Sequence, residues 1–187
     1  MPAGYSELML QHLITHFSPT LLIATLLLAT TLAQQSGSPL LFLPAGVQLL
    51  AGFVYGLRSL PGCTLGLGFG MSLLAHHPLT TESLALWLFY GALSTLCLVG
   101  LIHLVCRVGD IDDQLSDLSY RHILLVVILQ AACDATLRTS LGPAPEQALA
   151  EYTHLQLWLI AASGNLLGSM AVAFSLWVLA GLRHTHV

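Results

Sequence analysis

Long apolar stretches alternate with short polar segments along the whole chain, and this alternation predicts helices that cross a membrane. A spanning helix needs about 20 mostly apolar residues, and six stretches approach or exceed that length. Charged residues mark most of the breaks between them, while the uncharged cluster QQSGSP at 34–39 marks a turn. We predict spans at about 10–33, 40–57, 61–75, 83–106, 120–141 and 154–182.

Local signals place the ends of several spans. Ser59 is predicted to cap the third span, with Pro61 tolerated in its first turn. Thr80 or Thr81 is predicted to cap the fourth span. The fold class that follows is all-α: a single domain, residues 1–187, built as a polytopic integral membrane bundle of six transmembrane helices.

Composition identifies these apolar helices as those of a membrane protein. Of the 187 residues, 56% are hydrophobic and 7% are charged, and the mean hydropathy is +0.81. Soluble domains carry about a quarter charged residues, so a soluble enzyme, a disordered segment and a nucleic-acid-binding protein are excluded. The first span lacks the basic start and the small-residue cleavage site of a signal peptide, and we expect it to stay in the protein.

The five arginines, in a chain without lysine, set the predicted orientation. Short cytoplasmic loops of membrane proteins are enriched in basic residues. With six spans, Arg58, Arg107, Arg121 and Arg183 fall on one side, and Arg138 lies toward the other. The side with four arginines is therefore predicted to be the cytoplasm, which makes both the N- and the C-terminus cytoplasmic.

Small residues are placed where helices could pack closely. Lipid gives no hydrophobic drive for helix association, so membrane helices meet through glycine and other small residues. The G-x-x-x-G spacing occurs four times, as Gly52 with Gly56, Gly62 with Gly66, Gly66 with Gly70, and Gly164 with Gly168. We expect these glycines to pack helices inside the chain, although the same spacing serves a homodimer or partner interface. The four cysteines form no C-x-x-C pair and are interpreted as small buried thiols.

A few polar residues fall at membrane depth and form the candidate site. An ionisable group at mid-helix costs about 2.5 to 3.5 kcal/mol on insertion scales, which makes it a candidate for function. Asp134 and Arg138, four residues apart, share a helix face and could form an ion pair. Gln48 and Asn165 fall at similar depth, roughly 12 Å and 16 Å from the outer ends of their spans. The predicted ligand-binding residues are therefore Gln48, Asp134, Arg138 and Asn165, with Gln156 in the same cluster.

Two hypotheses remain open for this cluster. Its groups could hydrogen-bond one another and only fix the register of the helices. Alternatively, they could line a pocket that is open to the outside and binds a small polar or charged ligand, or senses protons through Asp134.

The sequence predicts neither metal nor enzyme chemistry. His12 and His16 share a helix face on the side of His184 and His186, but no cysteine or carboxylate stands at matching spacing, and we expect no metal. The P-loop, G-x-S-x-G and H-E-x-x-H motifs are missing. We therefore predict that the chain is not an enzyme, with no catalytic residue and no cofactor.

Four short motifs stand at helix boundaries: LPAGV at 43–47, GLRSLPG at 56–62, ATL at 135–137 and GNLLG at 164–168. Together they resemble the first-class membrane-associated sensor domain (MASE type) of bacterial signalling proteins. In that family a Pro-x-Ala-Gly segment opens a helix, and the last helix usually carries Gly-Asp-x-x-Gly, where this chain has Asn165 in place of the acid. The resemblance spans about 40–182. It implies a multi-pass protein of the bacterial inner membrane, here as a stand-alone sensor domain without a kinase or cyclase output module.

The predicted function is that of an integral membrane sensor, which binds a small ligand or a partner and relays its state to another protein by helix rearrangement. The expected partners are the lipid bilayer and either a second copy of the chain or a signalling output protein, with no nucleic acid. The alternative is a substrate-binding or accessory subunit of a membrane transporter or larger membrane complex, because six helices of this length suit both.

Overall fold

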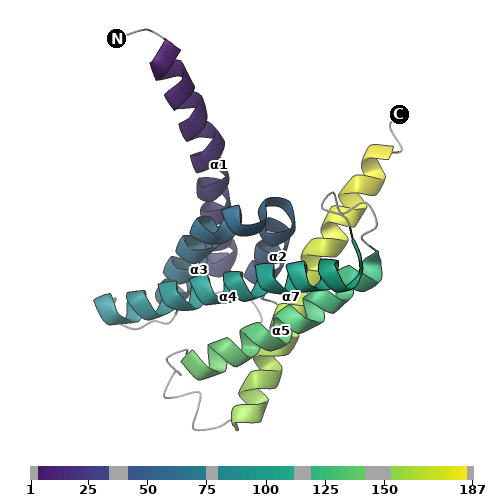
Figure 1. The fold of residues 1–187 in the computed structure, drawn as a ribbon. Coiled ribbons are helices and arrows are strands. Elements are labelled where there is room, and N and C mark those ends of the chain that lie inside the picture. Colours follow the sequence, from purple (N-terminus) through teal and green to yellow (C-terminus); the bar gives the residue numbers. More distant parts are fainter. Residues whose placement is uncertain (1–3, 34–41, 75–79, 112–118, 142–152, 185–187) are drawn as a thin grey trace.

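The chain is all-helical in a computed structural model, which describes residues 4–33, 42–74, 80–111, 119–141 and 153–184 (Figure 1). Side chains are described for 19–33, 42–73, 80–111, 119–141 and 153–175. The described residues form six α-helices and one 3-10 helix, and they contain no strand. The prediction of an all-α fold is confirmed.

Each predicted span corresponds to one helix. The helices are α1 (Gly4–Ala33), α2 (Leu43–Tyr55), α3 (Leu60–Leu74), α4 (Thr81–Val108), α5 (Tyr120–Leu141) and α7 (His154–His184), with the 3-10 helix η2 (Gly56–Ser59) between α2 and α3. Three described helices are long and apolar enough to cross a membrane: Thr81–Val108, Tyr120–Leu141 and His154–Ser175. They indicate a membrane protein. Since α2 has 13 residues and α3 has 15, the count of six crossings stays a prediction.

The helix ends follow local chemistry, with one correction. The Thr80 side chain accepts a hydrogen bond from the Ser83 backbone N–H, and the Ser83 hydroxyl accepts one from the Thr80 N–H, so Thr80 caps α4 as predicted. The prediction that Ser59 caps α3 is wrong. Ser59 lies inside η2, where its hydroxyl donates to the Gly56 carbonyl. The φ of Gly56 is +54°, a conformation that favours glycine, and it ends α2.

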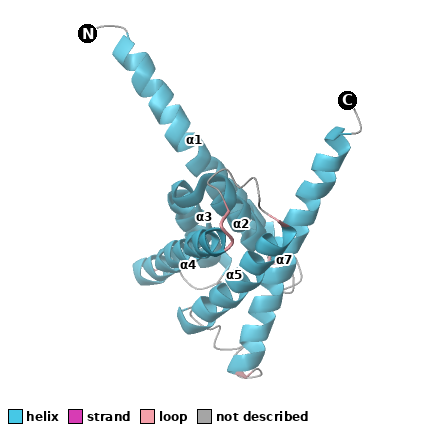
Figure 2. Cartoon of the chain, turned by 45° about the vertical axis from the view of Figure 1, so that its right-hand side comes forward, coloured by secondary structure: helices cyan, strands magenta, loops and turns pink. Residues whose placement is uncertain are grey.

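Helix α2 occupies the centre of the arrangement (Figures 1 and 2). It contacts α1, α4 and α7, while α3 packs between α1 and α4, and α5 packs between α4 and α7. The colours of Figure 1 show that α5 runs back against α4 and that α7 runs back against α5. The outer parts of α1 and α7 extend beyond the other helices toward the same end of the molecule in both views. The short α2 is thus surrounded by longer helices.

Glycines mark the closest helix contacts. A Cβ on Gly62, Gly66 or Gly70 of α3 would meet α1 at 2.8 Å or less, and one on Gly52 would lie 2.9 Å from Leu98 of α4. At the start of α2, the Phe42 N–H donates to the Gly164 carbonyl at 2.9 Å, and a Cβ on Gly168 would overlap the Phe42 carbonyl. Gly56 has open space around it and serves as the end of α2 instead. The spacing is therefore used inside the chain, through backbone approach.

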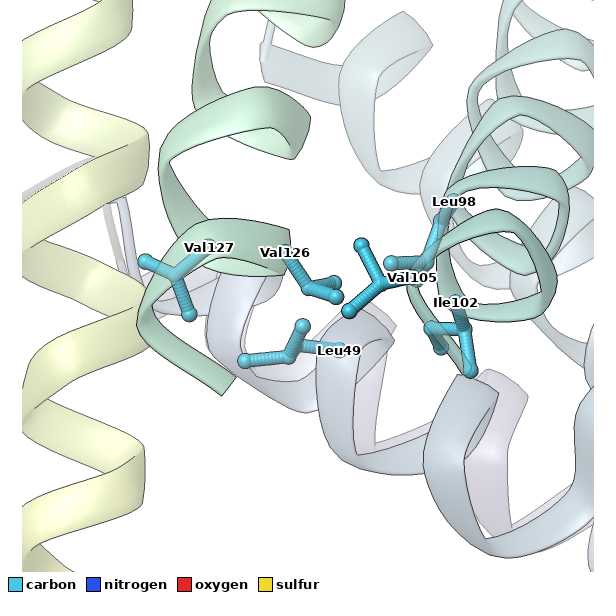
Figure 3. Packing of buried hydrophobic residues seen from close by; sticks show 6 residues of the cluster. All are labelled: Leu49, Leu98, Ile102, Val105, Val126 and Val127. Carbon is cyan, nitrogen blue, oxygen red and sulfur yellow. The ribbon is translucent and has the colours of Figure 1, made fainter. Parts of the chain in front are cut away.

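The main apolar cluster joins α2, α4 and α5. Its buried members are Leu49, Leu98, Ile102, Val105, Val126 and Val127 (Figure 3). Apolar side chains also cover the outer faces, and Leu22, Phe89 and Leu159 are each more than half exposed. Soluble monomers rarely present large contiguous apolar patches, so these faces fit contact with lipid.

Candidate functional site

The carboxylate of Asp134 on α5 is the centre of a buried polar cluster. Its side chain is only 3% exposed. Oδ1 accepts hydrogen bonds from the Tyr90 hydroxyl at 2.9 Å and from the Ser94 hydroxyl at 2.6 Å, both on α4. Oδ2 accepts one from the Asn165 amide, on α7, at 2.7 Å. One side chain thus holds three helices together.

A second layer of hydrogen bonds extends the cluster to α2. The Gln48 amide Nε2 donates to the Ser94 hydroxyl at 3.0 Å and to the Thr95 hydroxyl at 3.1 Å. Gln48 is 1% exposed, and Thr95 is fully buried. The Thr95 hydroxyl in turn donates to the Gly91 carbonyl of its own helix. The carboxylate of Asp134 on α5 is therefore connected to α4 and α2 through Ser94, and to α7 through Asn165.

The hydrogen bonds of the cluster offset the cost of burying a charged carboxylate. Hydrogen bonds to a charged group contribute about 1.5–3 kcal/mol each. Three such bonds to Asp134 are enough to offset the insertion cost of about 2.5–3.5 kcal/mol for a charged residue at mid-helix. The carboxylate can therefore remain buried without a neighbouring cation.

Helical spacing brings the cluster together. Tyr90 and Ser94 are four residues apart, so they stand one above the other on the face of α4 that meets α5. On α5, Gln130, Asp134 and Arg138 follow the same spacing and form one stripe. The Gln130 amide donates to the Ala45 carbonyl of α2 at 3.4 Å.

Arg138 lies at the edge of the cluster. Its guanidinium carbon stands 5.1 Å from the centre of the Phe42 ring, which is a cation–π arrangement. The expected ion pair with Asp134 is not among the contacts of these two described residues, because the carboxylate is taken by hydroxyl and amide donors.

Three polar atoms in the described part of the chain are buried without a hydrogen-bond partner: Trp87 Nε1, Gln130 Oε1 and Asn165 Oδ1. Buried polar atoms are nearly always paired, so each unpaired one needs an explanation. Trp87 packs edge-on against Tyr90, with ring centres 5.7 Å apart, and Gln130 and Asn165 belong to the cluster itself. The unpaired atoms are thus gathered around Asp134 rather than spread along the helices.

The structure brings together three of the predicted site residues, Gln48, Asp134 and Asn165, and places Arg138 beside them. The prediction that Gln156 joins the cluster is wrong. Gln156 is exposed at the start of α7, where its side-chain oxygen accepts hydrogen bonds from the Thr153 N–H and hydroxyl. Its polarity serves a helix cap and not the buried cluster.

Sequence reasoning missed Tyr90, Ser94, Thr95, Trp87 and Gln130. Gln130 could have been found, because it stands one turn from Asp134 on the same span. Hydroxyl and aromatic residues are common in membrane helices, so nothing in the sequence set Tyr90 and Ser94 apart.

Metal chemistry finds no support among the described side chains, where no group of three or more histidine, cysteine, aspartate or glutamate residues lies together. The side chains of His12, His16, His184 and His186 lie outside the described part. All four cysteines are described and are free thiols, of which Cys63 is fully buried and the other three are half-buried.

Comparison with protein-family models, with curated proteins and with solved structures finds no match for this chain. The assignment to a sensor-domain family therefore remains a prediction from short motifs. What the chain can do has to be argued from the cluster around Asp134.

Proposed function

We propose that this chain is a membrane sensor in which the hydrogen-bonding state of Asp134 sets the arrangement of the helices. The observation that carries the proposal is the connection of α4, α5 and α7 by one buried carboxylate. A change at Asp134 alters the contacts of several helices at once, and a partner protein in the membrane can read the new arrangement.

Two features of the packing support a relay. A ligand shifts a conformational equilibrium only when it binds two arrangements with different affinity, and a carboxylate with several exchangeable partners offers such a difference. The helices pack too closely at Gly46 and Gly168 to admit a larger side chain, since a Cβ on Gly46 would lie 2.5 Å from the Val172 side chain. Closely packed helices change between discrete arrangements rather than deforming continuously.

The proposal includes six crossings with both termini in the cytoplasm of a bacterial cell. It is supported by the alternating direction of α4, α5 and α7 and by the common end toward which α1 and α7 extend. The family resemblance, with its sensor role and its output partner, belongs to the same proposal.

Cysteine labelling tests this topology in intact cells. In a chain whose four cysteines are replaced by alanine, we expect single cysteines at Asp113 and His186 to resist a membrane-impermeant reagent applied outside. A single cysteine at Ala144 should react with it. Labelling of Asp113→Cys and His186→Cys from opposite sides would rule out the two crossings, by α5 and α7, that the proposal places between them.

Distance measurements between spin labels test the relay. Labels at the exposed positions Leu96 on α4 and Leu167 on α7, in the cysteine-free chain in lipid nanodiscs, report the separation of two helices tied through Asp134. We expect Asp134→Ala to change the distance distribution, because it removes all three bonds. The matched control, Gln156→Ala, alters an exposed cap and should leave the distribution unchanged.

An unchanged distribution in Asp134→Ala would remove this residue from the relay. Stoichiometric co-purification of the chain with an ATPase or transport subunits would replace the sensor proposal by the accessory-subunit alternative.

A further inference from the structure

We infer that the ligand of this site is a proton, which binds Asp134 at Oδ2 while the Asn165 amide turns over to accept the resulting O–H. The inference rests on the proposed function and names the ligand of the same cluster. It is carried by the geometry of four side chains: Tyr90, Ser94, Asp134 and Asn165.

All three donors to the carboxylate can reverse their role. Serine and tyrosine hydroxyls both donate and accept hydrogen bonds, and an asparagine amide presents a donor at one end and an acceptor at the other. Two nearby groups can only donate, and neither bonds to Asp134. Arg138 lies over Phe42, and the Trp87 N–H has no partner in the described structure. The surroundings of Asp134 therefore suit both its charged and its neutral form.

Asn165 supplies the acceptor that the neutral acid needs. The residue is 1% exposed, its Nδ2 lies 2.7 Å from Asp134 Oδ2, and its Oδ1 has no partner among the described residues. Rotating the amide by half a turn about the Cβ–Cγ bond exchanges the places of Nδ2 and Oδ1. The rotated Oδ1 then stands within hydrogen-bond distance of a protonated Oδ2, at the place where Nδ2 stood before.

The step is simple in chemical terms. A hydronium ion that reaches the site gives its proton to Oδ2. One O–H bond forms at Oδ2, one O–H bond of the hydronium breaks, and a water molecule is left. No group is oxidised or reduced. The carboxylate loses its negative charge. Its bonds from Tyr90 and Ser94 weaken, since charge-assisted hydrogen bonds are roughly twice as strong as neutral ones. The ties from α5 to α4 become weaker as a result.

The kinds of side chain around Asp134 favour a proton over a metal ion. The Ser94 hydroxyl is 2.6 Å and the Tyr90 hydroxyl is 2.9 Å from Oδ1, distances that hold a hydrogen atom between two oxygens. Calcium takes about six to eight oxygen ligands at about 2.3–2.6 Å from the ion. The cluster has one carboxylate, and no group of three or more histidine, cysteine, aspartate or glutamate residues lies together among the described side chains.

The other ionisable groups around Asp134 are few. From α4, Tyr90 and Cys97 interact with it electrostatically. On α5, Arg138 interacts with Tyr90, and Cys133 interacts with Cys97. The polar side chains that α2 and α7 present are Gln48 and Asn165, which do not titrate. Thiols and phenols ordinarily lose protons only above neutral pH, so these neighbours stay neutral in acid.

Infrared difference spectroscopy of the full chain in lipid nanodiscs tests the inference. On acidification we expect the wild type to gain the C=O band of a buried carboxylic acid, together with a change in a side-chain amide band. Asp134→Asn should lose the acid band. Asn165→Leu should keep the acid band and lose the amide change. Gln156→Leu, which removes an exposed amide that caps α7 outside the cluster, should keep both.

The outcomes separate the inference from the proposed function. The inference that the ligand is a proton is contradicted if the wild type lacks the acid band at every pH. It is also contradicted if sodium chloride abolishes the band while choline chloride does not. If the spin-label distances still respond to Asp134→Ala in that case, the relay stands with another ligand. If the acid band appears and the distances are insensitive to both pH and Asp134→Ala, the proton site stands and the relay falls.

Discussion

At the scale of single residues, Ser94 is the link between the two layers of the polar cluster. Its hydroxyl donates to Asp134 at 2.6 Å and accepts from Gln48 at 3.0 Å. One small side chain therefore uses its hydrogen and a lone pair at the same time, and the bond to α2 depends on it.

Replacing Ser94 by alanine should lower the free energy of unfolding by about 1.5 kcal/mol, because one bond to a charged group is lost and Gln48 keeps only Thr95. Unfolding in mixed micelles measures the loss. Ser163→Ala is the matched control, since the Ser163 hydroxyl bonds only to carbonyls of its own helix. Equal effects of the two substitutions would contradict the role given to Ser94.

The sequence identified Gln48, Asp134 and Asn165 because amides and carboxylates are rare in apolar helices. It could not reveal their partners. The rotation of each helix about its axis decides whether Tyr90 faces Asp134 or lipid. Because the protein interior and the lipid are both apolar, the pattern of apolar residues in the sequence does not indicate this rotation. Leu26 and Leu27 illustrate the point, since the first is 46% exposed and the second is fully buried.

At the scale of elements, the backbone at the start of α2 packs directly on α7. The backbone of Phe42 lies directly against Gly168, and the Phe42 N–H bonds to Gly164. Backbone atoms cannot move aside as the end of a side chain can. The start of α2 is therefore fixed on α7.

Gly168→Ala should destabilise the chain by about 1–3 kcal/mol or more, because overpacking against backbone forces the two helices apart. Gly100→Ala is the matched control: a Cβ there meets nothing within 4 Å, and alanine favours the helix over glycine. Thermal unfolding in detergent compares the two variants. A Gly168→Ala protein as stable as Gly100→Ala would show that α2 can shift along α7.

Helix positions were predictable to within a few residues because charges and turn-forming residues interrupt apolar runs. The six helices begin and end close to the predicted spans, and α5 has the predicted bounds. The turn at η2 was not predicted in detail. There, the hydroxyl of Ser59 bonds backward to Gly56 instead of forward to α3, a local choice that composition does not determine.

At the scale of the whole molecule, the packing order could not be predicted from the sequence. Neighbours in sequence do pack together, as α3 with α4 and α4 with α5, but α2 contacts α7 from the other end of the chain. In water, an apolar stripe on each helix would mark the side that packs inward. Here lipid and core are equally apolar, so small residues and buried polar groups such as Asn165 carry that information.

The position of Asp134 along α5 also has an electrical consequence. Asp134 precedes the helix end at Leu141 by seven residues, about 10 Å, whereas the hydrocarbon core is about 30 Å thick. A charge that crosses the entire core does work of about 2.3 kcal/mol per 100 mV. In the proposed topology, a proton that binds Asp134 from the Leu141 end crosses roughly a third of that field, so under the proton proposal its binding should depend on acidity on that side and respond only weakly to voltage.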